Sequence, residues 1–134
     1  MNLFSIDIDW AHDDVIDYTL NLFAKHNVSC TIFATHDTPV LKNLNDSLFE
    51  IAIHPNFNSN LLNGKGKDAR QIVLELMEIF PDAKGVRSHS MTQSTPLLGV
   101  FSECKLNYDS NHFLPYWPDI KPFVYGGVKA LIKL

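Results

Sequence analysis

The sequence lacks the long apolar segments of membrane and exported proteins. No apolar run approaches the roughly 20 residues that a membrane-spanning helix needs. The first residues contain neither a basic region nor a long apolar stretch, so we expect no signal peptide. Only two cysteines occur, Cys30 and Cys104, and their spacing matches no metal-binding motif. We therefore expect a cytoplasmic protein without a membrane span, whose thiols are buried and reduced.

Charged residues are also few, and neither sign dominates. They make up 19% of the 134 residues, with a net charge of −4 and no run of lysine or arginine. This balance gives no extended basic surface, so we expect no nucleic-acid partner. Apolar residues make up 46%, which is ordinary for a globular chain. Because the sequence has no repeats or low-complexity segments, we expect residues 1–134 to form a single domain.

Strand-like and helix-like segments alternate along the chain. Expected strands cover residues 3–9, 28–35, 49–53, 84–86 and 106–108, and expected helices cover 13–27, 39–45, 68–80 and 95–103. We expect Asp13 or Asp14 to cap the first helix and Asp68 to cap the third, with residues 56–67 as a polar loop. This alternation predicts an α/β fold with a mostly parallel sheet of β/α units.

The C-terminal part of the sequence predicts a hairpin. Gly126 and Gly127 mark its turn, and a final apolar strand is expected over residues 130–134. The chain ends inside this strand. We therefore expect either a fragment of a longer protein or a homo-oligomer that covers the exposed C-terminal edge.

Polar residues gather where the expected strands end. These residues are Asp7 with Asp9, His36 with Asp37, His54 with Asn58, Arg87 with His89, and Asp109. In parallel α/β sheets, ligands bind beyond the carboxyl ends of the strands. Side chains alternate along a strand, so Asp7 and Asp9 are expected to point to the same side. Five such clusters at one edge favour a functional site over isolated packing residues.

Asp9 and His54 are candidate metal ligands. A carboxylate oxygen and an imidazole nitrogen together suit zinc or another first-row divalent ion. Asn58 follows His54 by four residues and can add an amide oxygen, which is a weak ligand. His89 can supply a further ligand or protonate a leaving group.

Asp7 and Arg87 suggest proton transfer beside such a metal. Asp7 can take a proton as general base. Arg87 can hold Asp7 in place, or it can neutralise a carboxylate or phosphate of the substrate. Simpler explanations fit each residue alone: a histidine at a strand end often only packs, and an arginine can tie loops together.

Three segments resemble motifs of the NodB-homology polysaccharide deacetylases, a carbohydrate esterase family. Residues 5–10 (Ser-Ile-Asp-Ile-Asp-Trp) resemble the first motif, residues 50–58 the histidine-bearing second motif, and residues 86–90 the arginine motif. Together with residues 35–39 (Thr-His-Asp-Thr-Pro), they are most similar to the WbmS-like branch. Proteins of that branch are associated with surface-polysaccharide (O-antigen) gene clusters. The resemblance runs through essentially the whole chain, in motif order.

The resemblance implies a distorted (β/α)7 barrel, here partial, and a divalent metal that is usually zinc. It implies that metal-bound water hydrolyses an N- or O-linked acetyl group of an acetylated sugar or polysaccharide precursor. Asp7 would be the base and Arg87 the residue that orients it. Asp9 and His54 would be metal ligands. Four flanking residues are expected to contact the substrate, namely Trp10, His36, Asp37 and Asn56.

The chain departs from the family pattern at two places. The second motif of the family has another histidine four residues after the first, where this chain has Asn58. Asn58, His89 or His36 would then complete the metal shell. The late Leu-x-His motif, which supplies the general acid in the family, does not occur. We expect His89 or His112 to replace it, or the chain to be a truncated deacetylase domain.

Two other functions remain open from the sequence. A catalytically inactive deacetylase-like module would bind a glycan or a partner without hydrolysing it. A haloacid-dehalogenase-like phosphatase would use Asp7 as nucleophile and Asp9 as acid, with magnesium. Trp10 and Ala11 stand where that phosphatase needs a small hydroxyl residue, and His54 would have no role, so this function is disfavoured.

Overall fold

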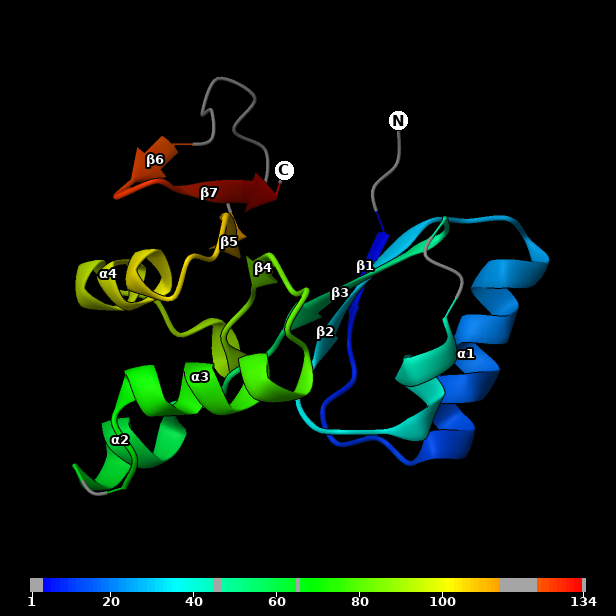
Figure 1. Cartoon of the computed structure of the whole chain (residues 1–134), viewed down its shortest axis with the longest axis horizontal. Coiled ribbons are helices and arrows are strands. Elements are labelled where there is room, and N and C mark those ends of the chain that lie inside the picture. Colours follow the sequence, from blue (N-terminus) through cyan, green and yellow to red (C-terminus); the bar gives the residue numbers. More distant parts are fainter. Residues whose placement is uncertain (1–3, 45–46, 65, 114–122, 134) are drawn as a thin grey trace.

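The computed structural model describes residues 4–44, 47–64, 66–113 and 123–133, in which strands and helices alternate (Figure 1). The strands are β1 (Phe4–Asp7), β2 (Cys30–Ala34), β3 (Phe49–Ile53), β4 (Gly85–Val86), β5 (Tyr108–Phe113), β6 (Phe123–Tyr125) and β7 (Val128–Lys133). The α-helices are α1 (Asp13–Lys25), α2 (Asn58–Asn63), α3 (Ala69–Ile79) and α4 (Thr95–Glu103), and the 3-10 helices are η1 (Pro39–Asn43) and η2 (His89–Met91). No helix within these ranges has both the length and the apolar character needed to cross a membrane.

The strands form one curled sheet in the order β1-β2-β3-β4-β5-β7-β6. Neighbours from β1 to β7 run parallel, and β6 runs antiparallel to β7. The sheet makes a half-barrel, with α1, α3 and α4 along its outer side (Figure 1). This arrangement confirms the partial (β/α) barrel that the sequence predicts. The hairpin expected around Gly126 and Gly127 joins β6 to β7.

The two faces of the sheet follow from the alternation of side chains along each strand. In β2, Cys30, Ile32 and Ala34 belong to the apolar core that the helices cover. Residues between them face the other way, and the guanidinium of Arg87 lies 4.0 Å from the centre of the Phe33 ring on that face. The helices therefore bury one apolar face, while the inner face of the half-barrel carries polar groups.

Several expected boundaries are wrong. Residues 56–67 are not only a loop, because α2 forms within them and ends at Gly64 in a left-handed conformation. His12, not Asp13 or Asp14, caps α1, since its ring accepts a hydrogen bond from the backbone of Asp14. The expected helix over 39–45 is the shorter 3-10 helix η1. Asp68 does cap α3, and it forms a capping box with Gln71.

Candidate metal centre and active site

Asp9 reaches the site through a tight turn after β1. The strand ends at Asp7, and Asp9 and Trp10 have φ values of 37° and 58°, in the left-handed region. The backbone N–H of Trp10 donates to the Thr35 hydroxyl over 3.1 Å, which ties the turn to the end of β2. Strand alternation therefore does not explain the position of Asp9. The turn itself directs the carboxylate towards the ends of β3 and β4.

His54 follows β3 and is buried, with 3% of its surface exposed. Its Nδ1 lies 2.6 Å from the carbonyl oxygen of Arg87, so Nδ1 carries the proton and donates to that carbonyl. Nε2 lies 3.3 Å from Oδ1 of Asp9. Burial lowers the pKa of His54 below its ordinary value, against the opposing effects of Asp7, the Arg87 carbonyl and Asp9. The neutral ring therefore turns a lone pair towards a carboxylate.

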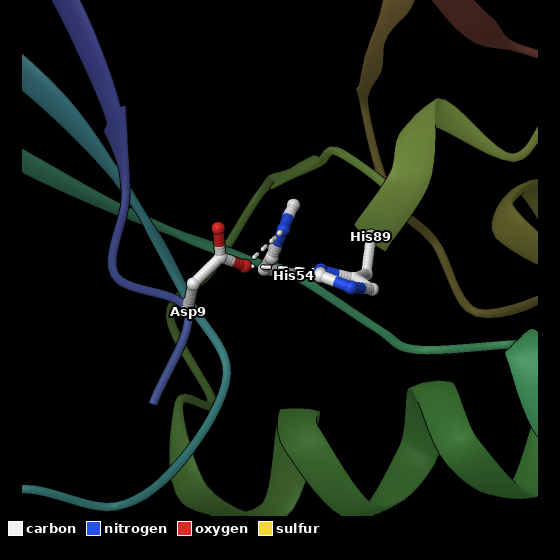
Figure 2. Close-up of side chains that lie close together, drawn as sticks. All are labelled: Asp9, His54 and His89. Carbon is white, nitrogen blue, oxygen red and sulfur yellow. Dashed lines mark hydrogen bonds and ion pairs between the residues drawn. The ribbon is translucent and has the colours of Figure 1, made fainter. Parts of the chain in front are cut away.

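His89 completes a three-residue cluster (Figure 2). It begins η2, and its Nδ1 lies 3.0 Å from the same Oδ1 of Asp9. The rings of His54 and His89 meet edge to face with centroids 5.5 Å apart. One ligand atom from each residue lies within 4.8 Å of the others. Figure 2 shows the carboxylate of Asp9 facing both rings.

The donor set fits a divalent cation. Two ligands of a tetrahedral zinc ion, each about 2.0–2.1 Å from it, lie about 3.3 Å apart. The distances from Oδ1 of Asp9 are 3.3 Å to His54 and 3.0 Å to His89. The neutral Nε2 of His54 and the carboxylate of Asp9 are both acceptors, so their approach calls for a cation or a proton between them. One carboxylate and two imidazoles also match the ligands of hydrolytic zinc sites.

Asp7 and Arg87 form an ion pair beside this cluster. Nη1 of Arg87 lies 2.7 Å from Oδ1 of Asp7. Nη2 donates to the hydroxyls of Ser5 and Ser110, and Nε donates to the backbone oxygen of Ser110. The side chain of Arg87 is 4% exposed and that of Asp7 is 31% exposed. Arg87 is therefore held in one position by several hydrogen bonds, while Asp7 stays partly exposed.

A cavity of about 330 Å³ adjoins the cluster. The four residues expected to contact a substrate all line it, together with His54 and one face of α3; these four are Trp10, His36, Asp37 and Asn56. Trp10 is 50% exposed, and its ring meets the ring of His89 edge to face at 5.1 Å. His54 therefore belongs to both the cavity and the candidate metal centre.

Asn58 and Asp109 have other surroundings. Asn58 begins α2, and its amide donates to the hydroxyl of Ser90, beside the turn that carries His89. Asp109 lies inside β5 and is fully buried, with its Oδ2 3.8 Å from Nδ1 of His112. The expected strand over 106–108 ends five residues too early, because β5 runs from Tyr108 to Phe113, and this wrongly placed Asp109 beyond the end of the strand.

Sequence reasoning missed the residues that support Arg87 and the following turn. Ser5 and Ser110 bind the guanidinium, and Asn111 binds Ser88. Thr35 was seen only as part of a motif, and its bond to the backbone of Trp10 was not anticipated. Serine and asparagine are common in turns, so their types alone carried no signal. Only the curvature of the sheet brings them to the site.

The chain was compared with protein families, curated proteins and solved structures. A family model described as WbmS-like polysaccharide deacetylase matches residues 4–134. A search of curated proteins found no match. Among solved structures, the chain resembles a protein of Bordetella bronchiseptica that is assigned as a polysaccharide deacetylase involved in O-antigen biosynthesis. The two share 36% sequence identity with a TM-score of 0.89.

The aligned region covers 97% of this chain and 56% of the Bordetella protein. The chain therefore spans little more than half the length of that protein. The family model, by contrast, covers almost every residue of the chain, from the first described strand onwards. By this match, the chain belongs to the WbmS-like family of polysaccharide deacetylases.

Proposed function

We propose that the chain carries the metal centre of a hydrolase that removes an acetyl group from a sugar of a surface-polysaccharide precursor. The observation that supports this most directly is the convergence of Asp9, His54 and His89 next to the Asp7–Arg87 ion pair. Family membership and the likeness to a protein assigned to O-antigen biosynthesis support the substrate class.

Asp9, His54 and His89 would hold the divalent ion, with zinc the best match to these donors. When bound, the ion supplies a Lewis acid for the acetyl carbonyl and makes a nearby water acidic enough to ionise close to neutral pH. The hydrogen bond from Nδ1 of His54 to the Arg87 carbonyl fixes the ring with Nε2 towards the site. Asn58 remains a candidate for a further, weaker contact through its amide oxygen.

Asp7 is the proposed general base. Arg87 engages Oδ1 of Asp7, so we assign proton acceptance to Oδ2. The bond from Arg87 holds the carboxylate in one orientation. Arg87 itself stays in place because Ser5 and Ser110 engage the rest of its guanidinium. This division of roles matches the carboxylate and arginine that the family resemblance implies.

Trp10 and the adjoining cavity would receive the sugar. An exposed indole next to a polar site offers an apolar surface for the face of a sugar ring. His36, Asp37 and Asn56 line the same cavity with groups that can hydrogen-bond to hydroxyls. The ring of His89 packs edge to face against the rings of both Trp10 and His54. If it does not bind the metal, it is the candidate acid for the leaving group.

The test combines metal analysis with an assay for released acetate. Purified protein is loaded with zinc, freed of excess metal, and offered N- and O-acetylated oligosaccharides. We expect one zinc ion per chain, lost in Asp9→Ala and His54→Ala, and a fall in acetate release of about 100-fold or more in Asp7→Asn with zinc retained. Asn21→Ala on the exposed side of α1 serves as the control.

The outcomes separate the candidate functions. No zinc in the wild type, or zinc unchanged in His54→Ala, contradicts the proposed centre. Zinc binding without acetate release from any acetylated sugar would instead support a module that binds glycans without hydrolysing them.

A further inference from the structure

Ser88 lies between two residues of the proposed site. The residue before it, Arg87, holds Asp7, and the residue after it, His89, lies 3.0 Å from Asp9. β4 is only two residues long, and on its β3 side the segment is held by backbone hydrogen bonds from Arg87 to the Ile53 oxygen over 3.0 Å and from His89 to the Pro55 oxygen over 2.9 Å. The turn also contains two residues in the left-handed region, Ser90 with φ 58° and Met91 with φ 52°. Such backbone conformations persist only where the surroundings impose them.

Asn111 on β5 holds the segment from the opposite side, at Ser88. Its Oδ1 accepts a hydrogen bond from the backbone N–H of Ser88 over 2.7 Å, and its Nδ2 donates to the Ser88 hydroxyl over 3.2 Å. Both residues are buried, with Asn111 2% exposed and Ser88 fully covered. The two bonds engage both the backbone and the side chain of Ser88. The turn therefore cannot shift relative to β5 without breaking them.

Asp109 fixes the amide of Asn111 in turn. One oxygen of this buried carboxyl accepts from both the backbone N–H and the Nδ2 of Asn111. These contacts fix the orientation of the amide: Nδ2 donates to Asp109, which leaves Oδ1 to accept from the backbone N–H of Ser88. The buried chain of contacts therefore runs from Asp109 through Asn111 to Ser88, and from there along the backbone to Arg87 and His89.

We propose that Asn111 is a positioning residue of the metal centre, acting through Ser88 to set the places of His89 and Arg87. This inference rests on the proposed function of the Asp9, His54 and His89 cluster. Asn111 contributes no ligand in it, and its effect on the site is through the turn. Outer partners that hold ligands typically change metal affinity by about 10- to 100-fold when they are removed.

The test measures zinc affinity and the visible absorption of bound cobalt(II), which reports coordination, in Asn111→Ala. We expect zinc to bind about 10- to 100-fold more weakly and the cobalt spectrum to change in shape and intensity. Thr38→Ala is the matched control, because Thr38 is equally buried and its hydroxyl donates to Asp13 at the start of α1. Thr38→Ala should lower stability but keep the zinc affinity and the cobalt spectrum of the wild type.

Other outcomes are decisive in different ways. Wild-type zinc affinity and cobalt spectrum in Asn111→Ala would overturn the positioning role. If Asn111→Ala does not fold, Ser88→Ala is tested in its place. This change removes one of the two bonds and should weaken zinc binding by a smaller factor; unchanged zinc binding would overturn the proposal.

If the wild type binds no metal, the proposed function fails, and hydrogen exchange over residues 88–91 decides the positioning role. Faster exchange there in Asn111→Ala than in Thr38→Ala supports it, and equal exchange overturns it.

Discussion

Arg87 and Asp7 form a hydrogen-bonded ion pair across 80 positions of the sequence, with Nη1 2.7 Å from Oδ1. The guanidinium also donates to Ser5 and Ser110 and lies over the ring of Phe33. A single side chain therefore connects β1, β2 and β5 at the carboxyl end of the sheet. The pair serves the stability of the half-barrel as well as the orientation of Asp7.

Replacing Arg87 by lysine should destabilise the protein although the charge is kept. An ammonium group has no planar fork, so it cannot reach Asp7, Ser5 and Ser110 together, and it leaves buried acceptors unsatisfied. We expect a loss of about 2–4 kcal/mol in the free energy of unfolding, measured by urea titration. Ser5→Ala removes one acceptor only and should cost less than about 1 kcal/mol. Equal losses in the two variants would contradict the central role of the guanidinium.

Zinc should stabilise the folded chain against heat and urea. A ligand that binds only the native state at about 100 times its Kd adds about 2.7 kcal/mol to the free energy of unfolding. We expect this gain near pH 7.5 and its loss on adding a chelator. It should shrink as the pH falls below about 6.5, the ordinary pKa of histidine, because protons compete for imidazole nitrogens. Burial lowers the pKa of His54, so this ring stays neutral to a lower pH than an exposed histidine does.

Two variants provide the comparison for this prediction. His54→Ala should abolish the stabilisation by zinc. His36→Ala should keep it, since His36 lies at the cavity, where its ring contacts the Thr35 hydroxyl, and is not in the cluster. A zinc effect that survives His54→Ala would indicate binding elsewhere on the chain.

Gly85 makes room for the side chain of Tyr108. A Cβ added at Gly85 would overlap the Tyr108 ring, and that ring is held by a hydrogen bond from its hydroxyl to Glu50 over 2.8 Å. Gly85→Ala should therefore cost about 2–3 kcal/mol in the free energy of unfolding. Gly99→Ala in α4 is the matched control, because its Cβ meets no atom within 4 Å. That change should stabilise the protein by about 0.5–1 kcal/mol through helix propensity.

A double-mutant cycle tests the cause of the Gly85 effect. With Tyr108→Ala, the ring that an added Cβ would strike is absent. The cost of Gly85→Ala should then fall by at least about 1 kcal/mol, measured by urea titration. Strictly additive costs would point to a backbone effect of Gly85 and contradict the steric explanation.

The sequence predicted the order of the β/α units because each strand and helix has its own local pattern. The strand over 49–53, the cap at Asp68 and the helix from Thr95 to Glu103 all agree with the structure. The predicted boundaries of strands and helices were wrong where tertiary contacts determine them. β5 begins at Tyr108, at the position paired with Gly85 of β4, so its start depends on a neighbouring strand and not on its own residues.

The approach of Asp9 to His54, and of Asp7 to Arg87, agrees with what the motifs predicted, although the roles of these residues stay proposals. The place of His89 was left open, because its position depends on a turn with two left-handed residues that local propensity disfavours. Asn111 was not predictable at all. It matters only because β5 lies beside β4, and no pattern in residues 108–113 marks that contact.

The buried carboxyl of Asp109 should make stability depend on pH in a recognisable way. Burial raises the pKa of Asp109 above its ordinary value of 3.8, while His112, the N–H groups of Asn111 and Arg87 act in the opposite direction. Between 3.8 and the raised value, the folded state therefore binds more protons than the unfolded state. The stability that comes from this group is complete below the unfolded pKa and is lost as the pH rises through the folded pKa.

Asp109→Asn removes this dependence while keeping the shape of the side chain. An asparagine oxygen can still accept from the backbone and side chain of Asn111, so the contacts that hold Ser88 are kept. We expect the variant to gain stability relative to the wild type as the pH rises from about 4 to about 7, measured by urea titration at each pH. Ser94→Ala removes the N-cap of α4 and no titrating group, so its difference from the wild type should be the same at every pH. A constant difference for Asp109→Asn as well would show that burial of this carboxyl does not perturb its titration.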